Sequence, residues 1–194
     1  MNRYSAFGIA SAILLAAVII FSVSYVWIPH PSKSSQATGT YTQQELDAVN
    51  VTSGGITVLA QESSIYINSS SVLPVMMGPM NAPNMYSFEI LSLINPHIQV
   101  KAGVAVQFTV VNIDSDSYHN FVISSEGPPY PYMMGGGMMS GYYYTMMPYL
   151  PPAGSGSYSY TNFTVSFSHS GNFWYLCTYP GHAEQGMYGE ITVS

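Results

Sequence analysis

The stretch Cys177-Thr-Tyr-Pro-Gly-His182-Ala-Glu-Gln-Gly-Met187 decides the fold and the chemistry of this chain. It carries a thiol, an imidazole and a thioether, with four residues between each donor and the next. These are soft and borderline metal ligands, and one more imidazole completes the two-His, one-Cys, axial-Met set of blue copper. We expect His119 to supply that imidazole. The stretch therefore predicts a loop that binds one type 1 copper ion.

The single cysteine argues against other metal centres. Structural zinc prefers four Cys or His ligands and iron–sulfur clusters usually need four thiolates, whereas this chain has one Cys in 194 residues. The binuclear copper site of oxidase subunits needs a second, bridging Cys. The alternative to a copper site is a buried thiol with an incidental His and Met, because free cysteine is among the most buried residue types.

The sequence on both sides of the loop predicts strands and so favours the copper interpretation. Residues 171–177 have the composition of a strand that ends at Cys177, and residues 188–193 that of a strand leaving the loop. Upstream, residues 96–111 follow the pattern strand, turn, strand, and the chain then reaches His119 at the start of residues 119–123.

Apolar residues alternate with polar or small ones in several further segments, as in strands with one buried face. Seven or eight short strands with Gly, Pro and Asn between them fit an all-β fold, a two-sheet Greek-key β-sandwich. Residues 72–85 hold three prolines and four methionines, and we expect a loop there. The segments with this alternation, or with shorter β-type composition, are 56–59, 64–67, 87–91, 107–110 and 161–167.

These segments resemble the cupredoxin family. The spacing of Cys177, His182 and Met187, with Phe-Trp-Tyr-Leu before the Cys and Thr-Tyr-Pro-Gly after it, is most similar to the sulfocyanins, followed by rusticyanin. The resemblance covers residues 86–194. It implies a cupredoxin sandwich with a mononuclear blue copper site.

The resemblance also implies a role for each donor. Cys177 would give the short thiolate bond, His119 and His182 would complete a trigonal plane, and Met187 would be the weak axial ligand. Asn120 resembles the family residue that hydrogen-bonds across to the cysteine loop and fixes the ligand geometry.

Three histidines remain outside this set. We expect none of them to bind metal, because no other donor with ligand spacing accompanies them. They are His30, His97 and His169.

The first residues predict a membrane anchor. Residues 6–28 are 23 residues without a charge, and a helix needs about 20 apolar residues to span a bilayer. No small-residue cleavage site follows, so we expect residues 1–28 to remain as a transmembrane helix. Arg3 before it and aromatic residues at its far end orient the copper domain to the extracellular side of the cell membrane.

A linker and one folded domain are predicted to follow the anchor. Residues 29–49 are predicted to be a linker, with no apolar periodicity up to residue 42 and one helical turn at residues 44–49. Residues 50–194 are long enough for one domain with a substantial core.

One segment of that domain exceeds what a minimal sandwich needs. Residues 127–157 are a low-complexity insertion rich in Met, Tyr, Gly and Pro. Its methionine pairs could bind Cu(I), since thioethers are soft ligands. We favour a docking or covering loop, because Met-rich surfaces recur at binding sites.

The composition of the chain limits its possible partners and environment. Charged residues make up 6% of the chain, and Lys plus Arg number three, so no basic patch for nucleic acid can form. One Cys also excludes an intrachain disulfide. The scarcity of charge indicates adaptation to acid, and the sulfocyanins belong to acidophilic archaea, so the resemblance implies the same.

These observations predict an electron carrier and no enzyme. Four filled coordination positions leave no place for a small-molecule substrate, unlike catalytic metal sites, which keep one open. We expect a membrane-tethered carrier of a respiratory chain whose redox partner is a terminal oxidase or another respiratory complex, as the resemblance implies. Its docking face would surround His182 with Tyr179, Pro180, Ala183 and Tyr188. A copper-delivery protein that uses the Met clusters is the alternative, whereas a multicopper oxidase fragment is excluded because the paired His-x-His motifs are missing.

Overall fold

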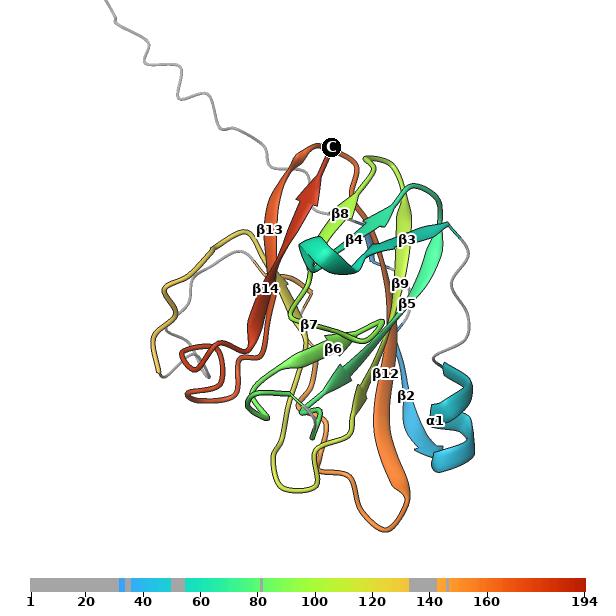
Figure 1. The fold of residues 1–194 in the computed structure, drawn as a ribbon, viewed down its shortest axis with the longest axis vertical. Coiled ribbons are helices and arrows are strands. Elements are labelled where there is room, and N and C mark those ends of the chain that lie inside the picture. The colour runs from blue at the N-terminus through green and yellow to red at the C-terminus, as the bar shows by residue number, and fades with distance from the viewer. Residues whose placement is uncertain (1–31, 34–35, 50–54, 81, 133–142, 146) are drawn as a thin grey trace, which may run out of the picture.

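Two β-sheets face each other and enclose one hydrophobic core (Figure 1). The computed structural model describes residues 32–33, 36–49, 55–80, 82–132, 143–145 and 147–194. The first sheet has the order β1 (Ser32–Lys33), β12 (Ser157–Ser166), β9 (Ala105–Asn112), β5 (Ser71–Met77), β6 (Phe88–Ile90), β7 (Leu93–Ile94), and β2 (Ala37–Thr42) also pairs with β12. The second has the order β11 (Tyr143–Thr145), β10 (Val122–Ser124), β13 (Gly171–Leu176), β14 (Tyr188–Val193), β8 (His97–Val100), β4 (Ser64–Ile67), β3 (Ile56–Leu59). The predicted all-β, two-sheet sandwich is confirmed.

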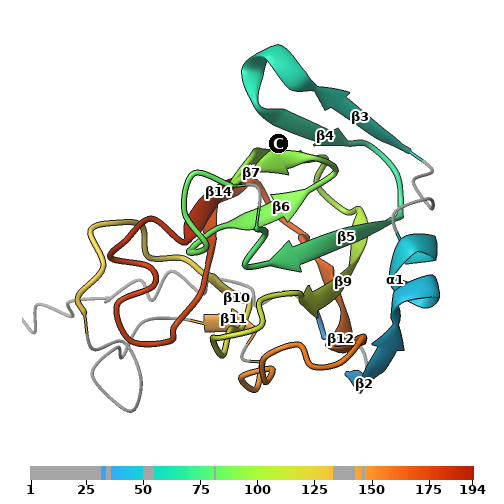
Figure 2. The same ribbon diagram turned by 60° about the horizontal axis from the view of Figure 1, so that its bottom comes forward.

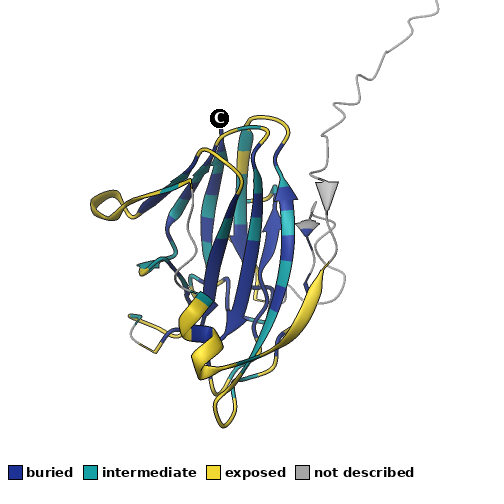
Figure 3. Ribbon diagram, turned by 90° about the vertical axis from the view of Figure 1, so that its right-hand side faces the viewer, coloured by how far each residue is buried: buried dark blue, intermediate teal, exposed yellow. Residues whose placement is uncertain are grey.

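The apolar residues that alternate in the sequence are the ones that are buried in the core. Along β12 every second residue from Thr161 to Val165 is buried, while the residues between them are partly exposed, and Phe167, just after the strand, is buried too. The inner faces of the central strands are buried, and exposed residues gather on the loops, on β2 and on the helix α1 (Gln43–Val49), as Figure 3 shows. A short 3-10 helix, Ala60–Glu62, connects β3 and β4.

Phe121 lies at the centre of the core. Its ring contacts those of Phe108 and Tyr175 at centroid distances of 5.2 Å, of Phe88 at 5.3 Å and of Phe163 at 6.1 Å. Replacing such a buried Phe with Ala typically costs about 3–5 kcal/mol. Because Phe121 is two residues from His119, the same packing fixes the backbone of the predicted ligand.

Residues 72–77 differ from the prediction of a loop. They form most of β5, a buried strand that runs parallel to β9 and antiparallel to β6. Pro74 argued against a strand, because proline cannot donate a ladder hydrogen bond. It is accommodated because β6 pairs with β5 only at Met76 and Met77, so Pro74 has a paired neighbour on one side alone.

The predicted linker also contains regular structure. Residues 37–42 form β2, which pairs antiparallel with residues 157–162 of β12, and Tyr41 stacks on Tyr160 at 3.8 Å. The helix α1 follows in agreement with the predicted turn, and its Leu46 packs against Met76 and Val111. Figure 2 shows α1 beside β2, on the other side of the molecule from the loop between β13 and β14. Part of the predicted linker is therefore attached to the sandwich.

The predicted membrane anchor, residues 1–28, lies outside the described residues. Among the residues that are described, no helix combines the length and the apolar character needed to cross a bilayer. Residues 133–142 of the predicted insertion are also outside the description, whereas β11 and Leu150, at its other end, belong to the sandwich.

Candidate metal centre

The loop between β13 and β14 is closed by its own backbone. The two strands pair antiparallel up to Leu176 and Tyr188, and the next amide, that of Cys177, donates to the carbonyl of Met187 at 3.1 Å. Within the loop, the amide of Met187 donates to the carbonyl of His182 at 3.0 Å. The three predicted donors of this segment are thus held close together by a short, hydrogen-bonded turn of chain.

Two glycines make the tight path of this loop possible. Gly181 and Gly186 have φ of +83° and +102°, a region that residues with a Cβ rarely adopt. A Cβ at Gly181 would also lie 2.8 Å from the ring of Tyr132. Gly181 is therefore required both for the turn into His182 and for the close approach of Tyr132.

His119 reaches the loop from a different part of the fold. It lies between β9 and β10 and forms an isolated bridge with Leu150, whose amide donates to the His119 carbonyl at 2.7 Å. The reciprocal amide of His119 donates to the carbonyl of Leu150 at 3.3 Å. The C-terminal part of the predicted insertion thus fixes the backbone of His119.

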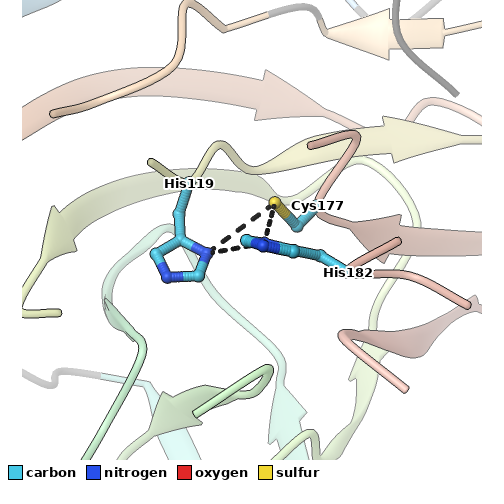
Figure 4. A group of neighbouring side chains, drawn as sticks. All are labelled: His119, Cys177 and His182. Carbon is cyan, nitrogen blue, oxygen red and sulfur yellow. Dashed lines mark hydrogen bonds between the residues drawn. The ribbon is translucent and has the colours of Figure 1, made fainter. Parts of the chain in front are cut away.

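The side chains of His119, Cys177 and His182 converge on one point, as Figure 4 shows. The Nδ1 atoms of the two imidazoles are 3.1 Å apart, and Sγ of Cys177 lies 3.5 Å from Nδ1 of His182 and 3.9 Å from Nδ1 of His119. A metal in a trigonal plane, with bonds of about 2.0 Å to nitrogen and 2.3 Å to sulfur, would separate its donors by about 3.5–3.8 Å. The three donor atoms therefore fit one metal ion.

The three side chains are almost completely shielded from solvent. His119 and Cys177 have no exposed surface and His182 is 4% exposed. Met187 is also fully buried and packs in the same core cluster as Cys177. A thiolate, two imidazoles and a thioether in an apolar, water-excluding shell make up the donor set of blue copper.

Burial decides the protonation of the metal-free donors. Desolvation raises the pKa of the Cys177 thiol to about 11, although backbone hydrogen bonds from Asn120 and Tyr179 partly oppose the change. Desolvation lowers the pKa of His182 to about 4, with a further decrease from the neighbouring His119, and it also lowers the pKa of His119. Both imidazoles are therefore neutral at pH 7 and can offer a lone pair to a metal.

Asn120 connects the two segments that carry the donors. Its Oδ1 accepts the amide N–H of Thr178 at 2.8 Å, and its Nδ2 donates to Thr178 Oγ1 at 2.8 Å. Thr178 follows Cys177 directly, so this pair of bonds fixes the cysteine relative to His119. The cross-loop hydrogen bond that the cupredoxin resemblance implied for Asn120 is confirmed.

Sequence reasoning did not find Asp114. Its Oδ2 accepts a hydrogen bond from Nε2 of His119 at 2.9 Å, and both side chains are buried. No sequence signal points to this contact, because an aspartate five residues before a histidine belongs to no metal-binding pattern in the chain.

His182 is covered by aromatic rings. The rings of Tyr86 and Tyr179 lie 4.6 and 4.8 Å from its centroid, and Tyr179 in turn contacts Tyr149 at 5.5 Å and Tyr118 at 6.4 Å. Tyr118 and Tyr149 are 45% and 39% exposed. We call Tyr118, Tyr149 and Tyr179 the tyrosine face.

The predicted docking face is therefore wrong in part. Ala183 is 1% exposed and packs with Tyr130 and Leu176 in a small cluster, with Tyr188 against its side. Tyr179 does contact the His182 ring, but its other ring contacts are Tyr118 and Tyr149, which come from other loops.

Two of the other histidines, His97 and His169, are described and lie apart from the three donors. Nε2 of His97 lies 2.9 Å from the Thr192 hydroxyl, and His169, on an exposed turn, is hydrogen-bonded to Ser168. His30 lies outside the described residues. Within the described part of the chain, His119, Cys177 and His182 are the one cluster of three or more His, Cys, Asp or Glu side chains able to hold a metal ion.

The methionines that the structure describes differ in exposure: Met80 and Met85 are exposed, whereas others lie in the interior. Met147 is 2% exposed and belongs to the core, as do Met76 and Met77 of β5. The methionine pairs at 133–134 and 138–139 lie outside the described residues.

Comparisons with known proteins agree with this donor set. The family described as copper binding proteins, plastocyanin/azurin family, matches residues 87–194. Rusticyanin from Acidithiobacillus ferrooxidans is 31% identical over 146 residues, which cover 72% of this chain and 68% of that protein, and rusticyanin from Acidithiobacillus ferridurans gives the same values. The structure of reduced rusticyanin covers 81% of this chain and 100% of its own, with a TM-score of 0.70 and 26% identity.

Proposed function

Because this chain belongs to the plastocyanin/azurin family of copper-binding proteins, we propose that His119, Cys177, His182 and Met187 are the ligands of its copper ion. The cupredoxin resemblance is confirmed by the family match, and the chain is a blue copper electron-transfer protein like rusticyanin, with one type 1 copper. The observation that carries the ligand assignment is the buried convergence of two imidazoles and one thiol, with the amide N–H of Cys177 donating a hydrogen bond to the carbonyl of Met187.

Each proposed ligand has a distinct task. Copper, when bound, supplies a centre that takes up and releases one electron between Cu(II) and Cu(I). His119 and His182 offer their Nδ1 lone pairs, and Cys177 gives up its thiol proton to become a thiolate. Asn120 and Thr178 hold the two donor segments in one geometry, which keeps structural change between the two oxidation states small. The buried shell excludes water and substrates, so the site has no bond chemistry to perform.

The electron leaves through the aromatic rings around His182. Tyr179 lies between the His182 imidazole and the exposed rings of Tyr118 and Tyr149. A redox partner would dock on the tyrosine face, a surface of aromatic rings that carry hydroxyl groups. Such a surface is suited to the small, short-lived interfaces of electron-transfer complexes.

The proposals on the membrane tether, the subfamily and the redox partner rest on the sequence. We propose a sulfocyanin-type carrier, tethered by residues 1–28 to the cell membrane, that passes electrons to a terminal oxidase of a respiratory chain on the extracellular side. Support comes from the 23 uncharged residues at 6–28, the spacing of the copper loop and the 6% content of charged residues.

Visible and EPR spectra of the copper-loaded protein test the ligand assignment. The wild type is expected to show an intense thiolate-to-copper band with one copper per chain, and Cys177→Ser is expected to lose the band. His169→Gln, at an exposed imidazole far from the donors, is the matched control and should keep the wild-type spectrum. A Cys177→Ser variant that remains blue would refute the assignment.

Membrane fractionation tests the tether. The full chain is expected in the membrane fraction, and a chain without residues 1–30 in the soluble fraction with its copper intact. Reduced soluble protein added to membranes of the source cells should then be oxidised at a rate that depends on a terminal oxidase. Full-length protein that is soluble and lacks its first residues would show that residues 1–28 are a cleaved signal peptide.

A further inference from the structure

The buried carboxylate of Asp114 is the feature of this site that copper coordination does not itself require. Its Oδ2 lies 2.9 Å from Nε2 of His119, on the opposite side of the ring from the Nδ1 that faces Cys177 and His182. The exposed fractions of the two side chains are 1% and 0%. Water therefore screens this contact very little.

Asp114 is held in place by several groups. Its amide donates to Oδ1 of Asn112 at 3.1 Å, its carbonyl accepts the amide N–H of Ala153 at 2.7 Å, and its Oδ1 accepts the amide N–H of Asp116 at 2.7 Å. Gly78, whose φ is +72°, packs so closely that a Cβ there would lie 2.4 Å from Cβ of Asp114. The carboxylate thus has one available position.

Asn112 adds a further restraint on the same loop. Its Nδ2 donates to the carbonyls of Ser117, Leu150 and Pro151 at 2.9, 3.0 and 2.9 Å. This one buried amide connects the loop before His119 to the strand segment that pairs with His119. The orientation of the imidazole is therefore fixed at both its backbone and its outer nitrogen.

Among the residues that the structure describes, no Lys or Arg pairs with the Asp114 carboxylate. In the described part of the chain, its ion-pair contact is with His119 alone, and His119 would carry the metal on its other nitrogen. A negative charge at this position stabilises the higher charge of Cu(II) more than that of Cu(I), because the low dielectric of the interior strengthens the interaction. A carboxylate behind a metal-bound imidazole also fixes its tautomer and increases its basicity.

We propose that Asp114 is a positioning residue that holds His119 with its proton on Nε2 and biases the site toward Cu(II). The inference rests on the proposed role of His119 as a copper ligand. Asp114 touches no ligand atom of the copper and acts only through the imidazole. Its charge and its hydrogen bond both lower the reduction potential of the protein.

The test compares Asp114→Asn with Asp116→Asn. The first variant keeps the shape and an oxygen acceptor but removes the buried charge, whereas the second removes a charge that is exposed, two residues away. We expect Asp114→Asn to weaken Cu(II) affinity 10–100-fold, as loss of such outer partners typically does, with Cu(I) affinity unchanged. For one electron that ratio corresponds to an increase of about 59–118 mV in reduction potential. Asp116→Asn is expected to produce less than half of this increase.

The outcomes separate this inference from the ligand assignment. If both variants are blue but Asp114→Asn has the wild-type potential, or shifts it no more than Asp116→Asn, the role of Asp114 is refuted while the ligands stand. If the wild type itself shows no thiolate-to-copper band, the proposed function fails first.

A measurement on the wild type covers the case in which Asp114→Asn does not fold. Nitrogen-15 NMR of the diamagnetic Cu(I) protein should show the His119 proton on Nε2, with slow exchange against solvent because the hydrogen bond to Asp114 is buried. An Nε2 proton that exchanges as fast as that of an exposed imidazole would overturn the role of Asp114, whereas a proton on Nδ1 would overturn the ligand assignment of His119.

Discussion

Replacement of Asn120 by alanine tests how strongly the two donor segments are coupled. The change removes both hydrogen bonds to Thr178, each 2.8 Å long. The amide N–H of Thr178 then has no partner at a buried position, which costs about 1–3 kcal/mol, and the lost bond to its hydroxyl adds about 1 kcal/mol. The hydroxyl itself stays close to Tyr149 Oη, at 3.3 Å. We therefore expect the metal-free domain to lose about 2–4 kcal/mol of unfolding free energy.

A double-mutant cycle isolates the contact. Thr178→Val removes only the hydroxyl and leaves Asn120 Nδ2 with a 3.4 Å contact to the carbonyl of Met147, so about 1 kcal/mol is expected for this variant. Because the two residues share the bond, the double variant should cost less than the sum by about 0.5–1.5 kcal/mol. Urea unfolding of the metal-free domain, followed by circular dichroism, gives the three free energies.

Asn172→Ala is the control for this experiment. Asn172 is an exposed asparagine on β13, and Asn172→Ala should change stability by no more than about 0.5 kcal/mol. In the copper form, Asn120→Ala should also weaken Cu(II) binding, by about 10–100-fold. A cost below about 1 kcal/mol together with strict additivity would show that the bond between the donor segments contributes little.

Three further predictions concern the proposed axial ligand Met187, the pH response and the packing of Gly189 against Tyr175. Met187→Leu should keep a copper site but increase its reduction potential, because the thioether's donation to Cu(II) is lost; an unchanged or decreased potential would show that Met187 is not axial. Burial lowers the pKa of His182 in the folded, metal-free chain to about 4, whereas in the unfolded chain this imidazole takes up a proton below about pH 6.5. The unfolded state therefore binds more protons between these pH values, and the thermal stability of the metal-free protein should fall as the pH drops from 6.5 to 4. The copper-loaded protein, in which the metal competes with that proton, should keep its visible band below the ordinary carboxylate range of about pH 4; equal pH profiles for the two forms would contradict this. Gly189→Ala places a Cβ 2.2 Å from the hydroxyl of the buried Tyr175 and should destabilise the domain by about 1–3 kcal/mol in urea unfolding, whereas Gly154→Ala, with open space around it, should change stability little.

The copper loop could be predicted from sequence because its information is local. Cys177, His182 and Met187 lie in eleven consecutive residues, and their donor types restrict the metal strongly. The strands on either side follow from alternation, which depends only on neighbours two residues apart. His119 has no such spacing to identify it, so its assignment depends on its place at the start of the segment 119–123 and on the family resemblance.

The parts that sequence reasoning missed depend on tertiary contacts. Pro74 argued against a strand in residues 72–77, and only the limited pairing of β6 shows why proline is accepted there. Asp114 reaches His119 because a hydrogen bond to Asn112 and close packing against Gly78 position the loop that carries Asp114. No sequence pattern predicts these contacts. Residues 37–42 lack apolar periodicity because β2 lies on the outside of the sheet, where a pairing strand needs no buried face.

The uneven distribution of the proposed ligands along the chain has a consequence for the unfolded state. Cys177, His182 and Met187 lie within eleven consecutive residues, so three of the proposed ligands are close together even in the unfolded chain, whereas His119 is 58 residues from Cys177. A metal stabilises a fold only by the difference between its affinities for the folded and unfolded chains, so binding to the unfolded loop reduces that stabilisation. With these four ligands, the contribution of copper to folding would be determined mainly by His119, the one imidazole that only the folded chain brings to the loop.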